Sequence, residues 1–143
     1  MSFLFFLVVL ISIGLWVGPC VADNPENRCI KQFAKTNPAC IVHCKYNLYK
    51  FTDDNYDITD QHINKFTDVL IKNKAVDGSK KSQVQEHLKK CAEESLKKTH
   101  GKNCQRLVEY YSCAVDNKLI DYFKYESAIN SYDRTIYTPP YSG

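Results

Sequence analysis

Residues 104–113 read CQRLVEYYSC, a segment that begins and ends with a cysteine. Apolar side chains recur through it at helical spacing, so we predict a helix over residues 103–117. At 3.6 residues per turn, Cys104 and Cys113 are about two and a half turns apart and leave opposite sides of that helix. Their sulfurs must therefore reach two different neighbours, and a helix that is cross-linked on both sides is a central helix.

The rest of the chain also predicts helices. Glycine and proline number only five each, which argues against a turn-rich β fold. Apolar periodicity predicts five further helices: 25–35, from 38 to beyond 48, 60–73, from a turn at 77–79 to 100, and 119–129. The predicted fold class is all-α, a compact bundle of about six helices. The tail after residue 132 cannot be helical through Pro139-Pro140.

Residues 1–22 are expected to be a secretory signal peptide. An almost uninterrupted apolar run covers residues 3–17, and small residues at Cys20 and Ala22 precede the expected cleavage. The alternative is an uncleaved anchor, but the run is shorter than the roughly 20 residues of a membrane helix. No later segment is apolar enough to span a bilayer, so no membrane partner is expected. The mature chain, residues 23–143, suits a single domain.

Cleavage would remove Cys20 and leave six cysteines, at positions 29, 40, 44, 91, 104 and 113. An even number in an oxidising compartment predicts three disulfides, although six cysteines allow about 15 pairings. A zinc site is the alternative, because His43 adjoins Cys44 and His87 lies one turn before Cys91. Zinc sites usually show several close Cys/His pairs, and a secretory compartment favours oxidation of the cysteines to disulfides, so we expect no metal and no cofactor.

The cysteine spacing resembles that of the insect odorant-binding protein superfamily. The resemblance rests on the three residues between Cys40 and Cys44 and the eight between Cys104 and Cys113, on an all-helical secreted chain. It implies disulfides from first to third, second to fifth and fourth to sixth cysteine. On this sequence the implied pairs are Cys29–Cys44, Cys40–Cys104 and Cys91–Cys113.

Two gaps between cysteines differ from the usual spacing of the superfamily and indicate a smaller group within it. The gap before Cys40 is short and the gap before Cys91 is long. With the size of the chain and the residues that flank the cysteines, these gaps resemble the 15-kDa salivary proteins of sand flies. The resemblance covers essentially the whole mature chain and implies secretion into saliva.

Charge is unevenly spread along the chain. The net charge is +3, but residues 53–68 hold five acids and one lysine, whereas residues 72–106 hold ten basic residues and four acids. The ten form our candidate polyanion-binding set: Lys72, Lys74, Lys80, Lys81, Lys89, Lys90, Lys97, Lys98, Lys102 and Arg106. Three glutamate-to-lysine pairs four residues apart, at 86–90, 93–97 and 94–98, suggest instead that part of the set only supports a solvated helix face.

The resemblance to the sand-fly group implies a function for these charges. It implies binding of anionic polymers and surfaces, such as polyphosphate and heparin-like or sulfated glycans, and thereby inhibition of contact-pathway coagulation. Lysines would hold phosphate or sulfate as mobile point charges, without selecting a specific nucleic acid. The sequence has no Gly-rich phosphate loop, nucleophile elbow or two-histidine zinc helix, so we expect no enzyme.

A carrier is the alternative function. Odorant-binding folds commonly hold a small hydrophobic ligand or a biogenic amine inside the bundle. Five aromatic residues are expected where the last two helices meet, namely Tyr110, Tyr111, Tyr122, Phe123 and Tyr125. Core packing explains such a group equally well. The short gap before Cys40 also argues for a reduced cavity.

Overall fold

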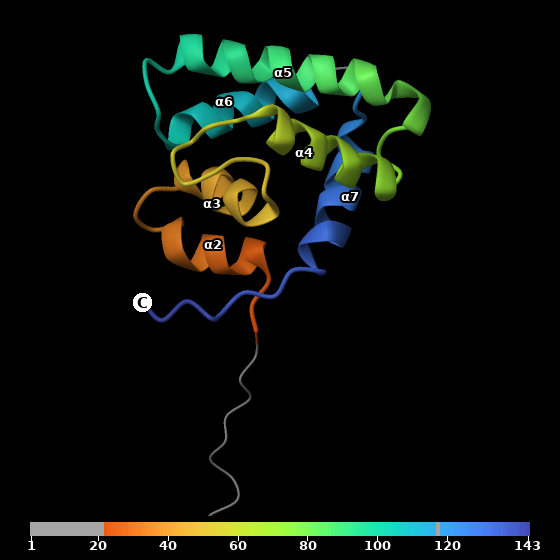
Figure 1. Ribbon diagram of the computed structural model, residues 1–143. Helices are drawn as coiled ribbons and strands as arrows, with labels where there is room; N and C mark the ends of the chain where they lie inside the picture. Colours follow the sequence, from red (N-terminus) through yellow and green to blue (C-terminus); the bar gives the residue numbers. More distant parts are fainter. Residues whose placement is uncertain (1–21, 117) are drawn as a thin grey trace, which may run out of the picture.

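The structure, a computed structural model, describes residues 22–116 and 118–143 (Figure 1). These residues form six α-helices and one 3-10 turn: α2 (Pro25–Phe33), α3 (Cys40–Tyr49), α4 (Asp60–Lys72), η1 (Gly78–Lys80), α5 (Lys81–Lys98), α6 (Cys104–Val115) and α7 (Tyr122–Asp133). The predicted all-α class is confirmed. The expected signal peptide, apart from Ala22, lies outside the described residues. In the described part, no helix combines the length and the apolar character needed to cross a bilayer.

Helix α6 lies at the centre of the arrangement. It packs against α5 on one side and α3 on the other, while α2 packs on α3, and α4 contacts both α5 and α7. Figure 1 shows α5 at one end of the molecule, α6 beneath it and α2 at the other end. The C-terminal tail crosses beneath α2, where an antiparallel bridge joins Asp23 to Thr138.

Three disulfides fix these contacts. Cys40–Cys104 joins the first residues of α3 and α6, Cys91–Cys113 joins α5 to α6, and Cys29–Cys44 joins α2 to α3. The three Cα–Cα distances are 4.9, 5.5 and 5.7 Å respectively, within the normal range for disulfides. These are the pairs that the resemblance implied, and they place α6 between its two cross-linked neighbours.

Capping side chains explain where helix boundaries differ from the predicted ones. The carboxylate of Asp77 accepts the Ser79 N–H at 2.8 Å, so the predicted turn at 77–79 is the short helix η1, and the helix that follows it, α5, ends at Lys98 rather than at 100. The carboxylate of Asp121 accepts the Lys124 N–H at 2.9 Å, so α7 starts at Tyr122 rather than 119 and extends to Asp133. Both aspartates satisfy backbone donors that a helix start leaves free.

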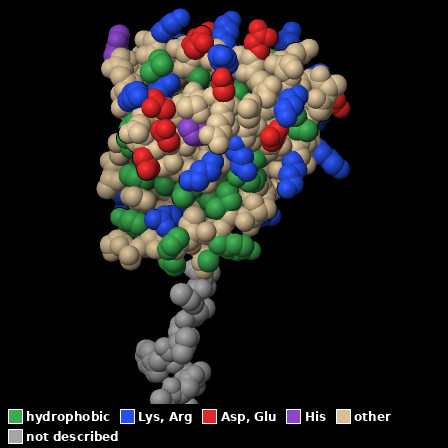
Figure 2. All heavy atoms as spheres, viewed as in Figure 1, with side chains coloured by type: hydrophobic (Ala, Val, Ile, Leu, Met, Phe, Trp, Pro, Cys, Tyr) green, Lys and Arg blue, Asp and Glu red, His purple; other side chains and the backbone are tan. Residues whose placement is uncertain are grey.

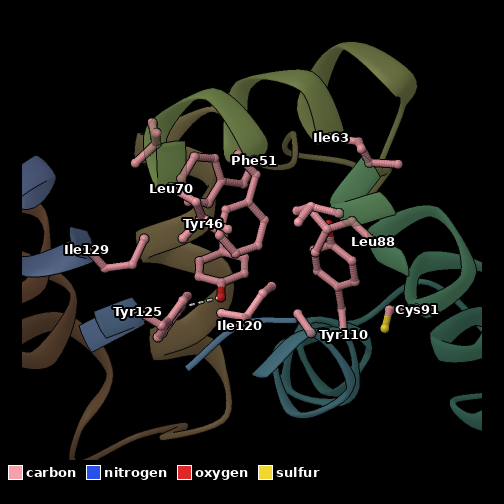
Figure 3. Packing of buried hydrophobic residues seen from close by; sticks show 14 of the residues in the cluster. Tyr46, Phe51, Ile63, Leu70, Leu88, Cys91, Tyr110, Ile120, Tyr125 and Ile129 are labelled. Carbon is pink, nitrogen blue, oxygen red and sulfur yellow. Dashed lines mark hydrogen bonds between the residues drawn. The ribbon is translucent and has the colours of Figure 1, made fainter. Parts of the chain in front are cut away.

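The core is built largely from aromatic rings (Figure 3). The rings of Phe51 and Phe66 stack with centroids 4.2 Å apart, and Tyr46 meets Phe66 edge-on at 5.5 Å. The hydroxyls of Tyr46 and Tyr125 lie 2.6 Å apart, so one donates a hydrogen bond to the other inside the core. Offset and edge-on contacts of this kind stabilise the core beyond the area they bury.

We expect buried tyrosines to set an alkaline limit on stability. Burial raises the pKa of Tyr46, Tyr110 and Tyr125, and each of the three is at most 3% exposed. The pKa of each buried tyrosine in the folded protein lies above the unfolded value of about 10. The stability that these tyrosines contribute is therefore fully present below about pH 10 and is lost as the pH rises further.

A pH titration tests this expectation. Tyrosinate absorbance of the buried group should appear only together with the loss of helical circular dichroism, in one cooperative step above about pH 10. Formation of tyrosinate on all ten tyrosines while the helices remain intact would contradict it.

Candidate polyanion-binding surface

Nine of the ten basic residues in the candidate set are exposed, and Arg106 is not. The Arg106 side chain is 3% exposed, donates from Nη1 to the carbonyl of Tyr56 at 2.5 Å and lies 3.6 Å from Asp57 Oδ1. Burial lowers the pKa of its guanidinium, and the Asp57 carboxylate opposes that shift. Arg106 therefore stabilises the loop before α4, and its inclusion in the surface set is corrected.

Four lysines gather where α4 ends and α5 begins. We call this group the α4–α5 turn cluster: Lys72, Lys74, Lys80 and Lys81. Only Lys81 has an ion pair with a described residue, to Asp68 at 2.9 Å. Figure 2 shows basic side chains crowding the edge of the molecule at this place. The nearby Asp77 carboxylate is engaged by the backbone of Ser79.

The cluster also lies at the positive end of a helix. The first turn of α5 has no acidic residue, and its N-cap makes no side-chain hydrogen bond. Free N–H groups at a helix N-terminus carry about half a positive charge, which ordinarily favours acids there. Lysines at this position add to the positive potential instead of neutralising it.

A second basic group lies at the other end of α5. It consists of Lys97, Lys98 and Lys102. Lys102 pairs with Asp57 at 2.7 Å and Lys98 with Glu109 at 3.9 Å, while Lys97 has no ion pair with a described residue. The 18 residues of α5 separate the two groups by about 27 Å.

The fold brings the acidic segment of the chain against the basic one. Lys81, Lys89 and Lys102 pair with Asp68, Asp60 and Asp57, all of which come from residues 53–68. The hydrogen bond from Lys102 is the largest cause that lowers the pKa of Asp57. These pairs join segments that lie apart in the sequence and were not predicted, although the opposite charges of the two segments were a usable signal. Exposed pairs of this kind contribute only about 0–1 kcal/mol to stability.

The three glutamate-to-lysine pairs predicted along α5 are wrong as ion pairs. None of them comes within 4.0 Å in the described chain, and Lys98 pairs with Glu109 of α6 instead. Lys90 and Lys97 are consequently left without an acidic partner among the described residues. More positive charge is available on this surface than the helical pairing pattern indicated.

The five aromatic residues proposed for a carrier pocket do not converge on one cavity. Tyr110 and Tyr125 are buried in the core, whereas Tyr122 is 48% and Phe123 is 81% exposed. Core packing therefore accounts for the first two. His87 lies 3.7 Å from the disulfide sulfur of Cys91, and no group of three or more possible ligands is placed to hold a metal among the described residues.

The six α-helices of the described residues and the three disulfides that join them define an all-α, disulfide-cross-linked protein. No protein-family model matches the chain. It is 99% identical over 143 residues, the full length of both chains, to Ayaconin from Lutzomyia ayacuchensis. It is also 36% identical over 135 residues to Salivary proteins 15a and 15b from Phlebotomus duboscqi, across 90% of this chain and 95% of each relative. The chain belongs to the sand-fly salivary protein 15 family, which indicates secretion.

Proposed function

We propose that the protein is a non-enzymatic salivary binder of anionic polymers and surfaces, and that this binding inhibits contact-pathway coagulation. The observation that carries the proposal is the α4–α5 turn cluster, in which three of four exposed lysines lack an ion pair with a described residue. Membership of a salivary family supports a role during blood feeding.

Binding of this kind needs positive charge rather than a shaped pocket. Each lysine ammonium that contacts a phosphate or sulfate releases a condensed counterion, and this release supplies most of the free energy of binding. Lysine is a mobile point charge, so polyphosphate and heparin-like glycans should both bind, with little selectivity between them. A coated polymer or surface would no longer be available to activate clotting factors.

The separation of the two basic groups adds a dependence on polymer length. A polymer that reaches from the turn cluster to Lys97 and Lys102 must extend over about 27 Å along α5. Once one end is bound, the second contact becomes intramolecular, which raises the overall affinity. Longer heparin fragments should therefore bind more tightly than fragments that cover one group only.

We predict that Lys74→Glu/Lys80→Glu weakens heparin and polyphosphate binding at least tenfold at low salt. Both residues are exposed and neither has an ion pair with a described residue, so the change should remove polymer contacts without breaking structural ones. Because each lost phosphate contact lowers the magnitude of the salt slope by about 0.7–0.9, the slope of log K against log salt should fall in magnitude by about 1.4–1.8. Isothermal titration calorimetry at several salt concentrations measures both quantities.

The matched control is Lys118→Glu/Lys124→Glu, which makes the same charge change on exposed lysines outside the candidate set. Its slope should stay close to that of the unaltered protein, and both variants should keep their melting temperatures. No binding by the unaltered protein at low salt would refute the proposed function. Equal losses in the two variants would mean that net charge, rather than the turn cluster, governs binding. Contact-activated clotting times should follow the measured affinities.

A further inference from the structure

We propose that the Cys91–Cys113 disulfide is a thiol-exchange site, at which a small peptide thiol of the glutathione class attacks Cys113 and His87 receives the Cys91 sulfur that leaves. Both cysteines line a cavity of about 360 Å³ between α5 and α6. Lys90 and Lys98 of the candidate set also line this cavity. The reaction takes place at sulfur, however, so the proposal does not rest on polyanion binding.

The two cysteines of this disulfide differ in how accessible they are. Cys91 is 1% exposed, whereas Cys113 is half-buried at the cavity. Figure 3 shows Cys91 at the margin of the buried cluster. Exchange depends on which sulfur a thiolate can reach. A thiolate that enters the cavity therefore attacks Cys113 and expels Cys91.

His87 lies beside the sulfur that is expelled. Its Nε2 and Nδ1 are 3.7 and 3.9 Å from Cys91 Sγ, and Nε2 is 3.2 Å from the carbonyl oxygen of Ala114. A proton on Nε2 is donated to that carbonyl, which leaves Nδ1 to exchange a proton with the sulfur. A thiolate next to an imidazolium is stabilised, and a stabilised thiolate is the faster leaving group.

A second histidine adjoins a disulfide in the sequence but is used differently. His43 precedes Cys44, yet its Nε2 lies 3.0 Å from the carbonyl oxygen of Asp53. This imidazole holds the loop before α4. We therefore expect the Cys29–Cys44 disulfide to exchange more slowly than the one beside His87.

The exchange balances in atoms and electrons. The thiol of glutathione gives its proton to His87, its sulfur forms a bond to Cys113 Sγ, and the Sγ–Sγ bond breaks with its electron pair on Cys91. His87 then passes the proton to Cys91. The products are a mixed disulfide at Cys113 and a free thiol at Cys91. A second glutathione attacks the mixed disulfide and leaves as oxidised glutathione, after which α5 is no longer cross-linked to α6.

Glu94 opposes the first step. Its Oε2 lies 3.7 Å from Cys113 Sγ, so the carboxylate repels an approaching thiolate. The two neighbours of this disulfide are therefore expected to act with opposite signs. Removing the imidazole should slow the exchange, and removing the carboxylate charge should accelerate it.

Timed incubation of the folded protein with reduced glutathione, followed by alkylation and peptide mass spectrometry, tests the proposal. Cys91–Cys113 should open at least tenfold faster than the other two disulfides, with glutathione on Cys113 and the alkyl group on Cys91. The rate should rise in proportion to the glutathione concentration, because the folded protein reacts. Equal rates for the three disulfides, glutathione on Cys91, or a rate limited by unfolding and independent of glutathione would each overturn the proposal.

Variants assign the roles of the two neighbours. His87→Gln should slow the opening of this disulfide at least tenfold, and Glu94→Gln should accelerate it at least threefold. Damaged packing would accelerate both, so slowing by His87→Gln is not a structural effect. The matched controls are His100→Gln and Glu93→Gln, because both residues are exposed and lie outside the cavity lining.

The variants also separate this proposal from the proposed function. Heparin binding by His87→Gln and glutathione exchange by Lys74→Glu/Lys80→Glu should both be normal. An unchanged rate in His87→Gln would overturn the role of the imidazole. A slower rate in Glu94→Gln would overturn attack at Cys113.

Discussion

Replacing Asp133 with alanine is expected to lower the free energy of unfolding by about 3–5 kcal/mol. Asp133 is the last residue of α7 and is 1% exposed. Its carboxylate accepts hydrogen bonds from the Tyr49 hydroxyl at 2.5 Å, from the Glu26 backbone N–H at 2.9 Å and from the side chain of Asn24. One side chain thus connects α7 with α3 and with the start of α2.

The expected loss of stability is large because alanine leaves three hydrogen-bond donors without their acceptor. Each buried donor that loses its acceptor costs about 1–3 kcal/mol, because it was desolvated on folding and finds no replacement. The Glu26 N–H is also a donor that the start of α2 leaves free, and Asn24, the N-cap residue, makes no cap hydrogen bond of its own. Asp133 therefore acts as the cap of a helix more than 100 residues earlier in the chain.

Chemical denaturation of Asp133→Ala, Asp133→Asn and Asp121→Ala measures the effect. Asp133→Asn keeps one acceptor oxygen and should be destabilised less than the alanine variant. Asp121 is an exposed aspartate at the start of the same helix, and its loss should cost only about 1 kcal/mol. If Asp133→Ala lowers the free energy of unfolding no more than Asp121→Ala does, the Asp133 carboxylate stabilises nothing beyond a local cap.

The cysteine pattern explains why the architecture was predictable. The nine-residue step from Cys104 to Cys113 is a local geometric fact, and it requires two different neighbours for α6. The structure supplies α3 and α5 as those neighbours. Helix existence was predictable for the same reason, because apolar periodicity acts within one segment. Helix ends were less predictable, since they depend on caps such as Asp121.

The roles of single charged residues were not predictable, because distant partners decide them. Arg106 lies among lysines in the sequence, but its guanidinium bonds to the Tyr56 carbonyl, 50 residues away, and is buried. Asp133 and Glu94 resemble the ordinary acids of a solvated helix, whereas the fold buries the first and places the second beside a disulfide sulfur. Neither position carries a local pattern that distinguishes it.

Removing the Cys40–Cys104 disulfide should be the most costly of the three disulfide deletions. Its two cysteines are 64 residues apart, against 15 for Cys29–Cys44 and 22 for Cys91–Cys113. A cross-link stabilises mainly by restricting the unfolded chain, and its contribution rises slowly with the loop it closes. We therefore expect a loss of about 4 kcal/mol for Cys40→Ala/Cys104→Ala and about 3 kcal/mol for either of the other pairs.

The comparison between two deletions on α6 isolates the effect of loop length. Cys40→Ala/Cys104→Ala and Cys91→Ala/Cys113→Ala each remove one cross-link from this helix, at its first residue and near its end. Alanine avoids placing a new polar group at Cys104, which is 8% exposed. Denaturant unfolding should give a lower free energy of unfolding for the first variant than for the second. In both variants the free energy of unfolding should fall more steeply with denaturant concentration, because the unfolded chain becomes more open. The reverse order would mean that native packing between α5 and α6, rather than the unfolded chain, determines what each disulfide contributes.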